Sequence, residues 1–223
     1  MYRRIDLRRV AIVMLVAIAL SGCGAAGTQG ATRREQRVER QALVALYEAT
    51  DGPNWGDDTN WLSVDPVTGI PAIDNLLGFG SVCDWYGVTC GPNGYVTELN
   101  LAGNNLYGPI PSEIGQLQDL SILILSLNRV TGLAPDIGRL QNLEELDLNA
   151  NSLTSLPPEI GQLQNLTTLY VGGNALTSVP PEVGQLHSLT ALSLNGNPLT
   201  GLPPEVCQMT VDVDIDTAPL CGE

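Results

Sequence analysis

The stretch that decides the fold is LEELDLNANSLTSLPPEIGQLQNL, residues 143–166. In its first half, leucines at 143, 146 and 148 are separated by polar residues, and an asparagine follows at Asn151. This spacing predicts a short β-strand with one buried side. In its second half, the prolines at 157–158 exclude a regular helix, so this part is expected to be extended or built of short turns.

The same pattern recurs along residues 96–206. A frame of Leu-x-x-Leu-x-Leu-x-x-Asn, with valine at two of its apolar positions, occurs five times, and its asparagines step by 24, 23, 23 and 23 residues. These asparagines are Asn104, Asn128, Asn151, Asn174 and Asn197. One unit cannot bury its own leucines, so the five units are expected to stack and share one interior. Each asparagine lies where its strand turns inward, and its amide is expected to bond the backbone of adjacent coils.

This period and frame resemble the leucine-rich repeat family. The resemblance covers half the chain and implies an α/β fold: a short right-handed solenoid with a curved parallel sheet of about six strands. The segment CDWYGVTC at 83–90, with the repeat that follows it, is similar to the N-terminal cap of plant-type members, and ATDGPNW at 49–55 is similar to related bacterial proteins. The family includes receptors, adhesins and inhibitors, which implies recognition of a protein or peptide without chemistry.

Between the buried leucines, each strand has side chains that point out of the sheet. Eight outward positions on the first four strands form what we name the sheet face, which is expected to be concave and to bind the ligand: Glu98, Asn100, Ile122, Ile124, Glu145, Asp147, Thr168 and Tyr170. Ala191 and Ser193 continue it on the fifth strand. The two isoleucines, with Leu127 beyond them, lie near carboxylates and suit a protein or peptide that carries basic residues. The alternative is that β-branched residues simply favour strands.

The composition excludes several classes of function. The chain has 223 residues, with 24 acidic and 10 basic side chains, one histidine and no lysine. From Gln41 onward there are 21 acidic residues and two arginines, a net charge of -19. Such a body repels polyanions, which excludes nucleic acid as a partner. The scarcity of histidine and lysine argues against an enzyme, a cofactor or a metal centre. The protein is expected to be a monomer. A salt-rich habitat is an alternative source of the acidity.

The first residues are typical of a secretion signal. Residues 1–9 contain four arginines, and residues 10–20 are an uninterrupted apolar run of eleven. A bilayer-spanning helix needs about 20 apolar residues, so this run is too short to span and is interpreted as the hydrophobic part of a signal peptide. A signal cut near Ala25, or a short membrane anchor, are the alternatives.

The sequence Leu20-Ser21-Gly22-Cys23 resembles the lipobox of bacterial lipoproteins. The resemblance implies a signal peptide over residues 1–22, acylation of Cys23, and a lipid anchor in a bacterial envelope. Residues 23–31 are small and polar and suit a flexible tether. Gly24 after the cysteine implies the outer membrane or the cell surface.

Residues 32–95 are expected to form the N-terminal cap that a repeat array needs. A capping-box pattern at 32–35 predicts the start of a helix, which Asp51-Gly52-Pro53 ends. Its buried side is predicted to carry Val38, Leu43, Leu46 and Tyr47. Irregular structure is expected between this helix and the first repeat.

Without Cys23, an even number of cysteines remains, which indicates disulfides formed in an oxidising compartment. Cys83 and Cys90 are expected to pair; a metal site is the alternative, but no second pair or histidine lies nearby in sequence. Cys207 and Cys221 are expected to close a loop of about 15 residues within a C-terminal cap, residues 207–223.

Two weaker patterns have simpler explanations. Four acidic residues imitate the spacing of a calcium-binding EF-hand loop: Asp212, Asp214, Asp216 and Glu223. Thr217 stands where that loop requires glycine, so a solvated strand face is favoured and no metal site is predicted. His187 occupies a slot that glutamine fills in other units, and it is interpreted as a surface substitution at a variable position.

No arrangement of serine, histidine and aspartate indicates a triad, so no catalytic residue is assigned. A function from another class is also considered: a leucine-rich repeat protein that binds cell-wall polysaccharide or inhibits an enzyme. That alternative predicts saccharide binding that depends on Tyr170.

Overall fold

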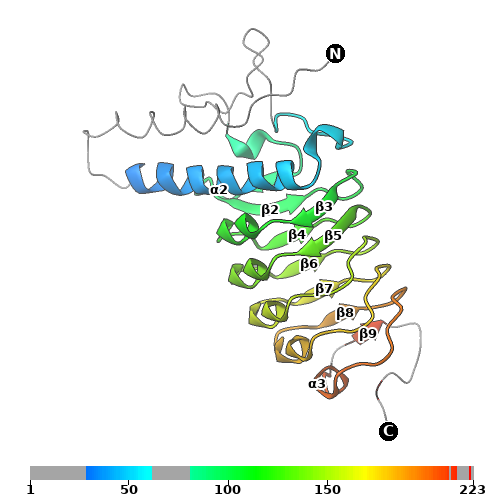
Figure 1. Ribbon diagram of the computed structural model, residues 1–223. Helices are drawn as coiled ribbons and strands as arrows, with labels where there is room; N and C mark the ends of the chain where they lie inside the picture. The colour runs from blue at the N-terminus through cyan, green and yellow to red at the C-terminus, as the bar shows by residue number, and fades with distance from the viewer. Residues whose placement is uncertain (1–28, 62–80, 211, 215–220, 222–223) are drawn as a thin grey trace. The chain divides into compact units, whose positions relative to one another are not determined.

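The computed structural model describes residues 29–61, 81–210, 212–214 and 221, with the backbone alone for residues 29–35 and 212. The chain divides into two units, residues 1–35 and residues 36–223, and only the helical residues 29–35 of the first are described. The second unit is a solenoid of stacked coils, each with a strand on one side and a short helix on another (Figure 1). The predicted α/β solenoid is confirmed.

The main sheet has one strand from each coil and one strand at either end. Its seven described strands follow in the order β1 (Val88–Cys90), β2 (Val96–Asn100), β4 (Ile122–Ile124), β6 (Glu145–Asp147), β7 (Thr168–Tyr170), β8 (Ala191–Ser193) and β9 (Asp212–Asp214). All neighbours are parallel except β1 and β2, which are antiparallel. The six strands from β2 to β9 are parallel, as predicted, and β1 adds an antiparallel strand at one end. A short loop joins β1 to β2, and only antiparallel strands can be joined so briefly.

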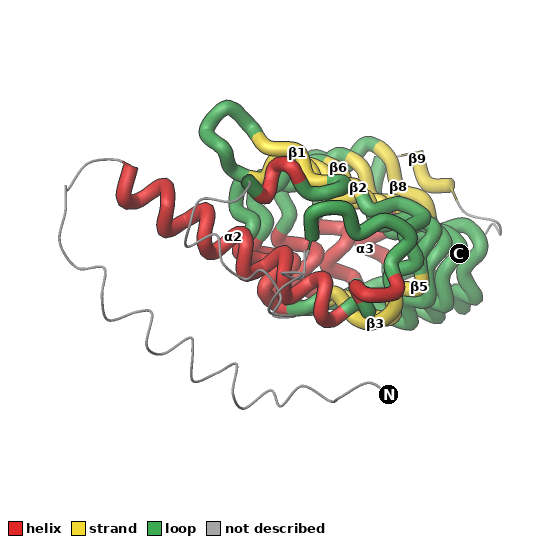
Figure 2. Tube along the Cα trace, turned by 90° about the horizontal axis from the view of Figure 1, so that it is seen from above, coloured by secondary structure: helices red, strands yellow, loops and turns green. Residues whose placement is uncertain are grey.

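A second, two-stranded sheet lies on a different side of the coils (Figure 2). It pairs β3 (Tyr107–Ile110) with β5 (Arg129–Leu133) in parallel, and the sequence pattern did not predict it. The return limb of each coil otherwise contains short 3-10 helices, as the prolines predict: η4 (Ser112–Gln116), η5 (Pro135–Arg139), η6 (Pro158–Gln162) and η7 (Pro181–Gln185). The last coil has a single α-helical turn, α3 (Pro204–Cys207). Proline is tolerated at these helix starts because the first amide has no intrahelical acceptor.

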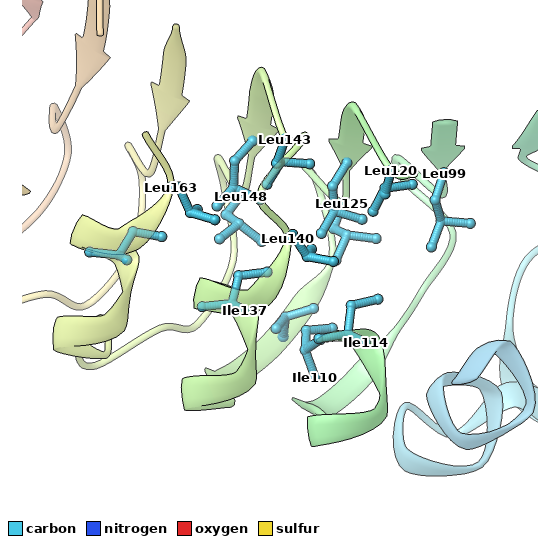
Figure 3. Packing of buried hydrophobic residues seen from close by; sticks show 14 of the residues in the cluster. Leu99, Ile110, Ile114, Leu120, Leu125, Ile137, Leu140, Leu143, Leu148 and Leu163 are labelled. Carbon is cyan, nitrogen blue, oxygen red and sulfur yellow. The ribbon is translucent and has the colours of Figure 1, made fainter. Parts of the chain in front are cut away.

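The interior is a continuous column of aliphatic side chains between the strands and the short helices (Figure 3). Leu99, Leu123, Leu146, Leu169 and Leu192 stack in register across the sheet, and none is more than 1% exposed. The helices approach each other closely as well. A Cβ placed on Gly161 would lie 2.5 Å from the carbonyl oxygen of Glu182 in the next coil, so only glycine fits there.

The asparagine at the end of each strand joins two coils. In Asn174, Nδ2 donates to the carbonyl oxygens of Leu148 and Val171 at 2.9 and 3.0 Å, and Oδ1 accepts from the amide of Leu153 at 2.9 Å. Asn128, Asn151 and Asn197 make the equivalent contacts with the coil before them. Asn104 has no earlier coil, and it bonds the backbone amide and carbonyl of Asp57 in the cap. Hydrogen bonds from the same asparagine position therefore connect each coil to the one before it and the first coil to the cap.

The cap begins with α2 (Gln29–Ala49), followed by η1 (Gly52–Asn54) and η3 (Val82–Asp84). The helix starts three residues before the predicted capping box at 32–35. Each added residue gains a backbone hydrogen bond, and this gain outweighs the low helix propensity of Gly30. Leu43, Leu46 and Tyr47 are buried as predicted, but Val38 is 36% exposed. Its place on the buried face is taken by Glu39, whose Oε1 accepts from the amide of Val96 at 3.1 Å.

Aromatic side chains fill the junction between α2 and the first coil. Trp55 packs edge-on against Tyr47 and Trp61, with ring centroids 5.1 and 4.8 Å apart, and Trp61 contacts Trp85 at 5.1 Å. The guanidinium of Arg40 lies 5.0 Å from the Trp85 ring, and burial lowers the pKa of Arg40. The two predicted disulfides, Cys83–Cys90 and Cys207–Cys221, are both formed.

Candidate functional site

The sheet face consists of two rows of outward side chains. Parallel pairing aligns Glu98, Ile122, Glu145, Thr168 and Ala191 in one row, and Asn100, Ile124, Asp147, Tyr170 and Ser193 in the other. Adjacent strands lie about 4.8 Å apart, so neighbouring side chains in a row are in contact distance. The structure therefore brings all eight predicted residues onto one surface.

Exposure differs along these rows. Asn100 is exposed, while the other seven residues of the sheet face are partly exposed. Ser193 is 7% exposed, which corrects the expectation that it would be free at the surface. Its Oγ donates to Oδ1 of Asn195 at 3.2 Å, so this small side chain turns toward its own strand end.

No arginine in the described part of the chain forms an ion pair with an acidic side chain of the sheet face. Among the residues that the structure describes, the ion pair present joins Arg139 to Asp136 on η5. Oδ1 of Asp147 accepts from the backbone amide of Asn149 at 2.9 Å, which fixes this carboxylate at the surface. The face thus presents partly exposed carboxylates beside apolar side chains.

Leu127 follows the apolar residues Ile122 and Ile124 of β4 in the chain. This side chain is 68% exposed, and its backbone has a φ of 58°, in the left-handed region. The same position in the other coils has positive φ too: Gly103, Ala150, Gly173 and Gly196. The turn requires this conformation, which costs a residue with a Cβ about 1–3 kcal/mol. Leu127 is thus an exposed apolar side chain held in an unfavourable backbone conformation.

Near the C-terminal end of the sheet, a hollow of about 390 Å³ opens over β8. We name it the β8 hollow; its floor includes Ala191 and Ser193, and its walls include Asn149, Tyr170, Asn195 and Asp214. The hollow exists because both outward residues of β8, Ala191 and Ser193, are small. In the row of Ser193, the neighbouring strands β7 and β9 carry the larger side chains of Tyr170 and Asp214.

Sequence reasoning assigned Asp214 to a solvated strand beside the last coil and did not place it on the sheet face. In the structure, β9 pairs with β8 in parallel, so Asp214 extends the row that contains Tyr170 and Ser193. Asn195 Nδ2 donates to Oδ2 of Asp214 at 2.7 Å. The alternating Val-Asp-Val-Asp pattern signalled a strand, but not its register.

The position that His187 occupies links neighbouring coils elsewhere in the stack. Gln118, Gln141 and Gln164 occupy it in earlier coils, and each Nε2 donates to a carbonyl in its own coil and to one in the next. These bonds connect the short helices along the stack. His187 is exposed.

The described residues contain no group of three or more histidine, cysteine, aspartate or glutamate side chains that could hold a metal ion. Asp216 and Glu223, which the EF-hand spacing requires, lie outside them. The predicted signal, the apolar run at 10–20 and Cys23 lie outside them as well. No helix in the described part of the chain is long and apolar enough to cross a bilayer.

Two family models match the repeats. One, described as a leucine-rich repeat region, matches residues 99–193, and one described as a leucine rich repeat matches residues 188–209. Among curated proteins, Protein MALE DISCOVERER 2 of Arabidopsis thaliana is 44% identical over 61 residues, which is 27% of this chain. The chain covers only 9% of the length of this relative.

Solved structures resemble the chain over a larger share of its length. The BIR2 ectodomain from Arabidopsis thaliana is 25% identical with a TM-score of 0.64, and the match covers 82% of this chain and 96% of that one. The BIR3–SERK2 complex from the same plant is 28% identical with a TM-score of 0.63, and the match covers 78% of this chain and 92% of that one. The structure of PEPR1–AtPEP1 is 25% identical with a TM-score of 0.61, and the match covers 79% of this chain and 24% of that one. The chain therefore carries a leucine-rich repeat domain over residues 99–209 and has the fold of leucine-rich repeat ectodomains.

Proposed function

We propose that this chain is a non-enzymatic binding module that recognises a protein or peptide with basic residues through the sheet face. The observation that carries the proposal is the alignment of the two outward rows, where Ile122 and Ile124 adjoin Glu145 and Asp147 on neighbouring strands. Apolar anchors edged by carboxylates that no described arginine pairs with favour a ligand with both apolar and cationic groups. No metal, cofactor or nucleic acid is part of the proposal.

The comparisons support a binding role. Two of the similar structures are complexes, one of BIR3 with SERK2 and one of PEPR1 with AtPEP1, and both share this fold. Fold alone does not name a ligand. The basic character of the ligand is argued from this chain's own sheet face, which contains three carboxylates and neither lysine nor arginine.

The proposal is tested by selecting peptides from a random display library on the immobilised full chain. We expect the selected peptides to be enriched in arginine or lysine, and their affinity to fall as salt rises from 50 to 500 mM, because exposed charges are screened. In the double variant Glu145→Arg with Ile124→Ala, affinity is expected to fall at least tenfold.

The matched control is Asp119→Arg with Val38→Ala. Asp119 and Val38 are exposed and lie off the sheet face, and these changes reverse one charge and truncate one aliphatic side chain as before. Unchanged affinity in the control and loss in the sheet-face variant support the proposal. Equal affinity in both variants, or selection of acidic peptides, would contradict it.

The proposal includes display on a bacterial envelope through a lipid on Cys23, in the outer membrane or at the cell surface, as a monomer. The lipobox at 20–23 supports it, and the two disulfides favour an oxidising compartment. The domain division 1–22, 23–31, 32–95, 96–206 and 207–223 belongs to the same proposal. Radiolabelled palmitate is expected to enter the chain and to be absent from Cys23→Ser; label retained in that variant would reject the anchor.

A further inference from the structure

We propose that the β8 hollow binds one arginine side chain of the ligand. This inference rests on the proposed function, since it names a group of that ligand and the place where the group docks. The hollow lies on β8, three strands along the sheet from Ile122 and Ile124 on β4, and it continues the row that contains Asp147 and Tyr170.

The walls of the hollow are spaced for a planar cation. Tyr170 and Asp214 lie on strands that flank β8, two strand spacings or roughly 10 Å apart. Ser193 lies between them in this row, Ala191 lies on the same strand in the other row, and both are too small to fill the space. A guanidinium fits there with one face on the Tyr170 ring and its N–H groups toward the Asp214 carboxylate.

The polar atoms around the hollow are arranged to accept such a group. Oδ2 of Asp214 is held by Asn195, while its Oδ1 has no hydrogen-bond partner among the described residues. Ser193 fixes Oδ1 of Asn195, so a chain of two hydrogen bonds orients the carboxylate. In the part of the chain that the structure describes, the Tyr170 hydroxyl also has no hydrogen-bond partner.

A glycine keeps this arrangement in place. The backbone amide of Gly172 donates to Oδ1 of Asn149 at 2.7 Å, and the side chain of Asn195 occupies the space that a Cβ would need. A Cβ at Gly172 would overlap Oδ1 of Asn195 and displace the amide that holds Asp214. Contacts between three coils therefore position Asn149 and Asn195 at the hollow.

The charges favour arginine over a saccharide, which an aromatic ring and amides would otherwise suit. Asp214 and Asp147 are carboxylates of one row, and the nearest arginines in sequence, Arg129 and Arg139, belong to β5 and η5, away from the main sheet. A planar guanidinium offers several donors to one carboxylate and stacks on an aromatic ring, whereas an ammonium is a compact charge.

The test titrates the full chain with N-acetyl-arginine methylamide and follows the side-chain amide signals of Asn149 and Asn195 by NMR. We expect saturable shifts of these two signals. The citrulline analogue, which has the same shape without the charge, is expected to bind at least tenfold more weakly. Binding is expected to weaken at least fivefold in Asp214→Asn and two- to fivefold in Tyr170→Leu.

Two further variants guard against misfolding and a general charge effect. Ala191→Leu fills the hollow without a change of charge, and it is expected to abolish the shifts while the urea midpoint stays within error. Asp119→Asn makes the same charge change as Asp214→Asn at an exposed site off the hollow and is expected to bind normally. Equal binding of arginine and citrulline, or full affinity in Asp214→Asn, would overturn the assignment, and so would saturable binding of cellobiose that Asp214→Asn leaves intact.

The outcomes separate this inference from the proposed function. If the arginine probe fails while selected peptides still require Glu145 and Ile124, the inference about the hollow is wrong and the sheet face stands. If the probe binds as expected and no peptide depends on the sheet face, the proposed function is wrong and only the arginine site remains.

Discussion

The inward and outward rows of side chains lie on the same strands of the sheet, but only the inward row has the same residue type in every coil. The inward row has leucine in five successive coils, whereas the row beside it reads Asn100, Ile124, Asp147, Tyr170 and Ser193. Stacking requires an inward side chain of one size at one place, because each coil packs on two neighbours. It requires little of an outward side chain. The chemistry that does not repeat is therefore the part of the sheet that is free to serve a ligand.

The largest expected effect breaks the inward row. Leu146→Ala should lower the free energy of unfolding by about 2–5 kcal/mol, because it leaves a cavity between two coils in a fully buried column. Glu145→Ala, one residue earlier on the same strand, should change it by less than about 0.5 kcal/mol. Urea unfolding followed by circular dichroism measures both, and similar losses would refute the division between the rows.

A somewhat smaller effect is expected from the asparagines. Asn174→Ala removes the amide that bonds Leu148, Val171 and Leu153, so buried backbone groups lose their partners. A cost of about 2–3 kcal/mol follows from the desolvation of those groups.

The matched control is Asn165→Ala. Asn165 also spans two coils, through Nδ2 to the carbonyl of Gln141 at 2.7 Å, but it is exposed, so water replaces the lost bond. Its expected cost is about 0.5 kcal/mol. If both variants lose the same free energy, burial is not what makes the inner asparagines important.

The inward half of the molecule is predictable from sequence because its chemistry is periodic. Leucine spacing gave the strands, the shared interior and the turns at the asparagines, and paired cysteines gave both disulfides. The sheet of β3 and β5 was missed because Gly108 and Pro109 favour turns, and in this case pairing with the neighbouring coil overrides that preference. Val38 was predicted to be buried, but Glu39 is buried instead, because a shift of one residue rotates a helix face by about 100°.

The arrangement of β8 and β9 could not be predicted from the sequence. Asp214 follows Ser193 by 21 residues, while Ser193 follows Tyr170 by 23, and β9 lacks the leucine frame that sets register in the coils. The small size of Ala191 and Ser193 is visible in the sequence. That they form a hollow depends on which side chains flank them, and this is known only once β9 is placed beside β8.

At Leu127 an outward side chain is kept at a cost to the stability of the fold. Leu127→Gly should raise the free energy of unfolding by about 1 kcal/mol, because glycine adopts a φ of 58° without strain. The same change should weaken binding of selected basic peptides, because it removes an exposed apolar anchor next to Ile124.

Ala150→Gly is the control, since Ala150 has a φ of 52° but no large side chain. It should gain similar stability and leave peptide binding unchanged. Thermal unfolding and peptide titration of the two variants separate backbone strain from the apolar contact. A loss of binding in both would mean that the turn, and not the leucine, serves the ligand.

The smallest effect lies where the inward column ends without a repeat, at Tyr47 in the cap. Its hydroxyl donates to Oδ2 of Asp58 at 3.0 Å, and burial together with this carboxylate raises its pKa from 10.0 to about 12. The neutral phenol is therefore favoured by the folded state, so its contribution is complete below pH 10 and is lost as the pH rises from 10 to 12. Near neutral pH the phenol is protonated in both the folded and the unfolded chain, so the unfolding free energy is not expected to change with pH through this group. The unfolding free energy of Tyr47→Phe should fall less steeply than that of the native chain over this window, and parallel curves would show that the cap does not depend on the proton of Tyr47.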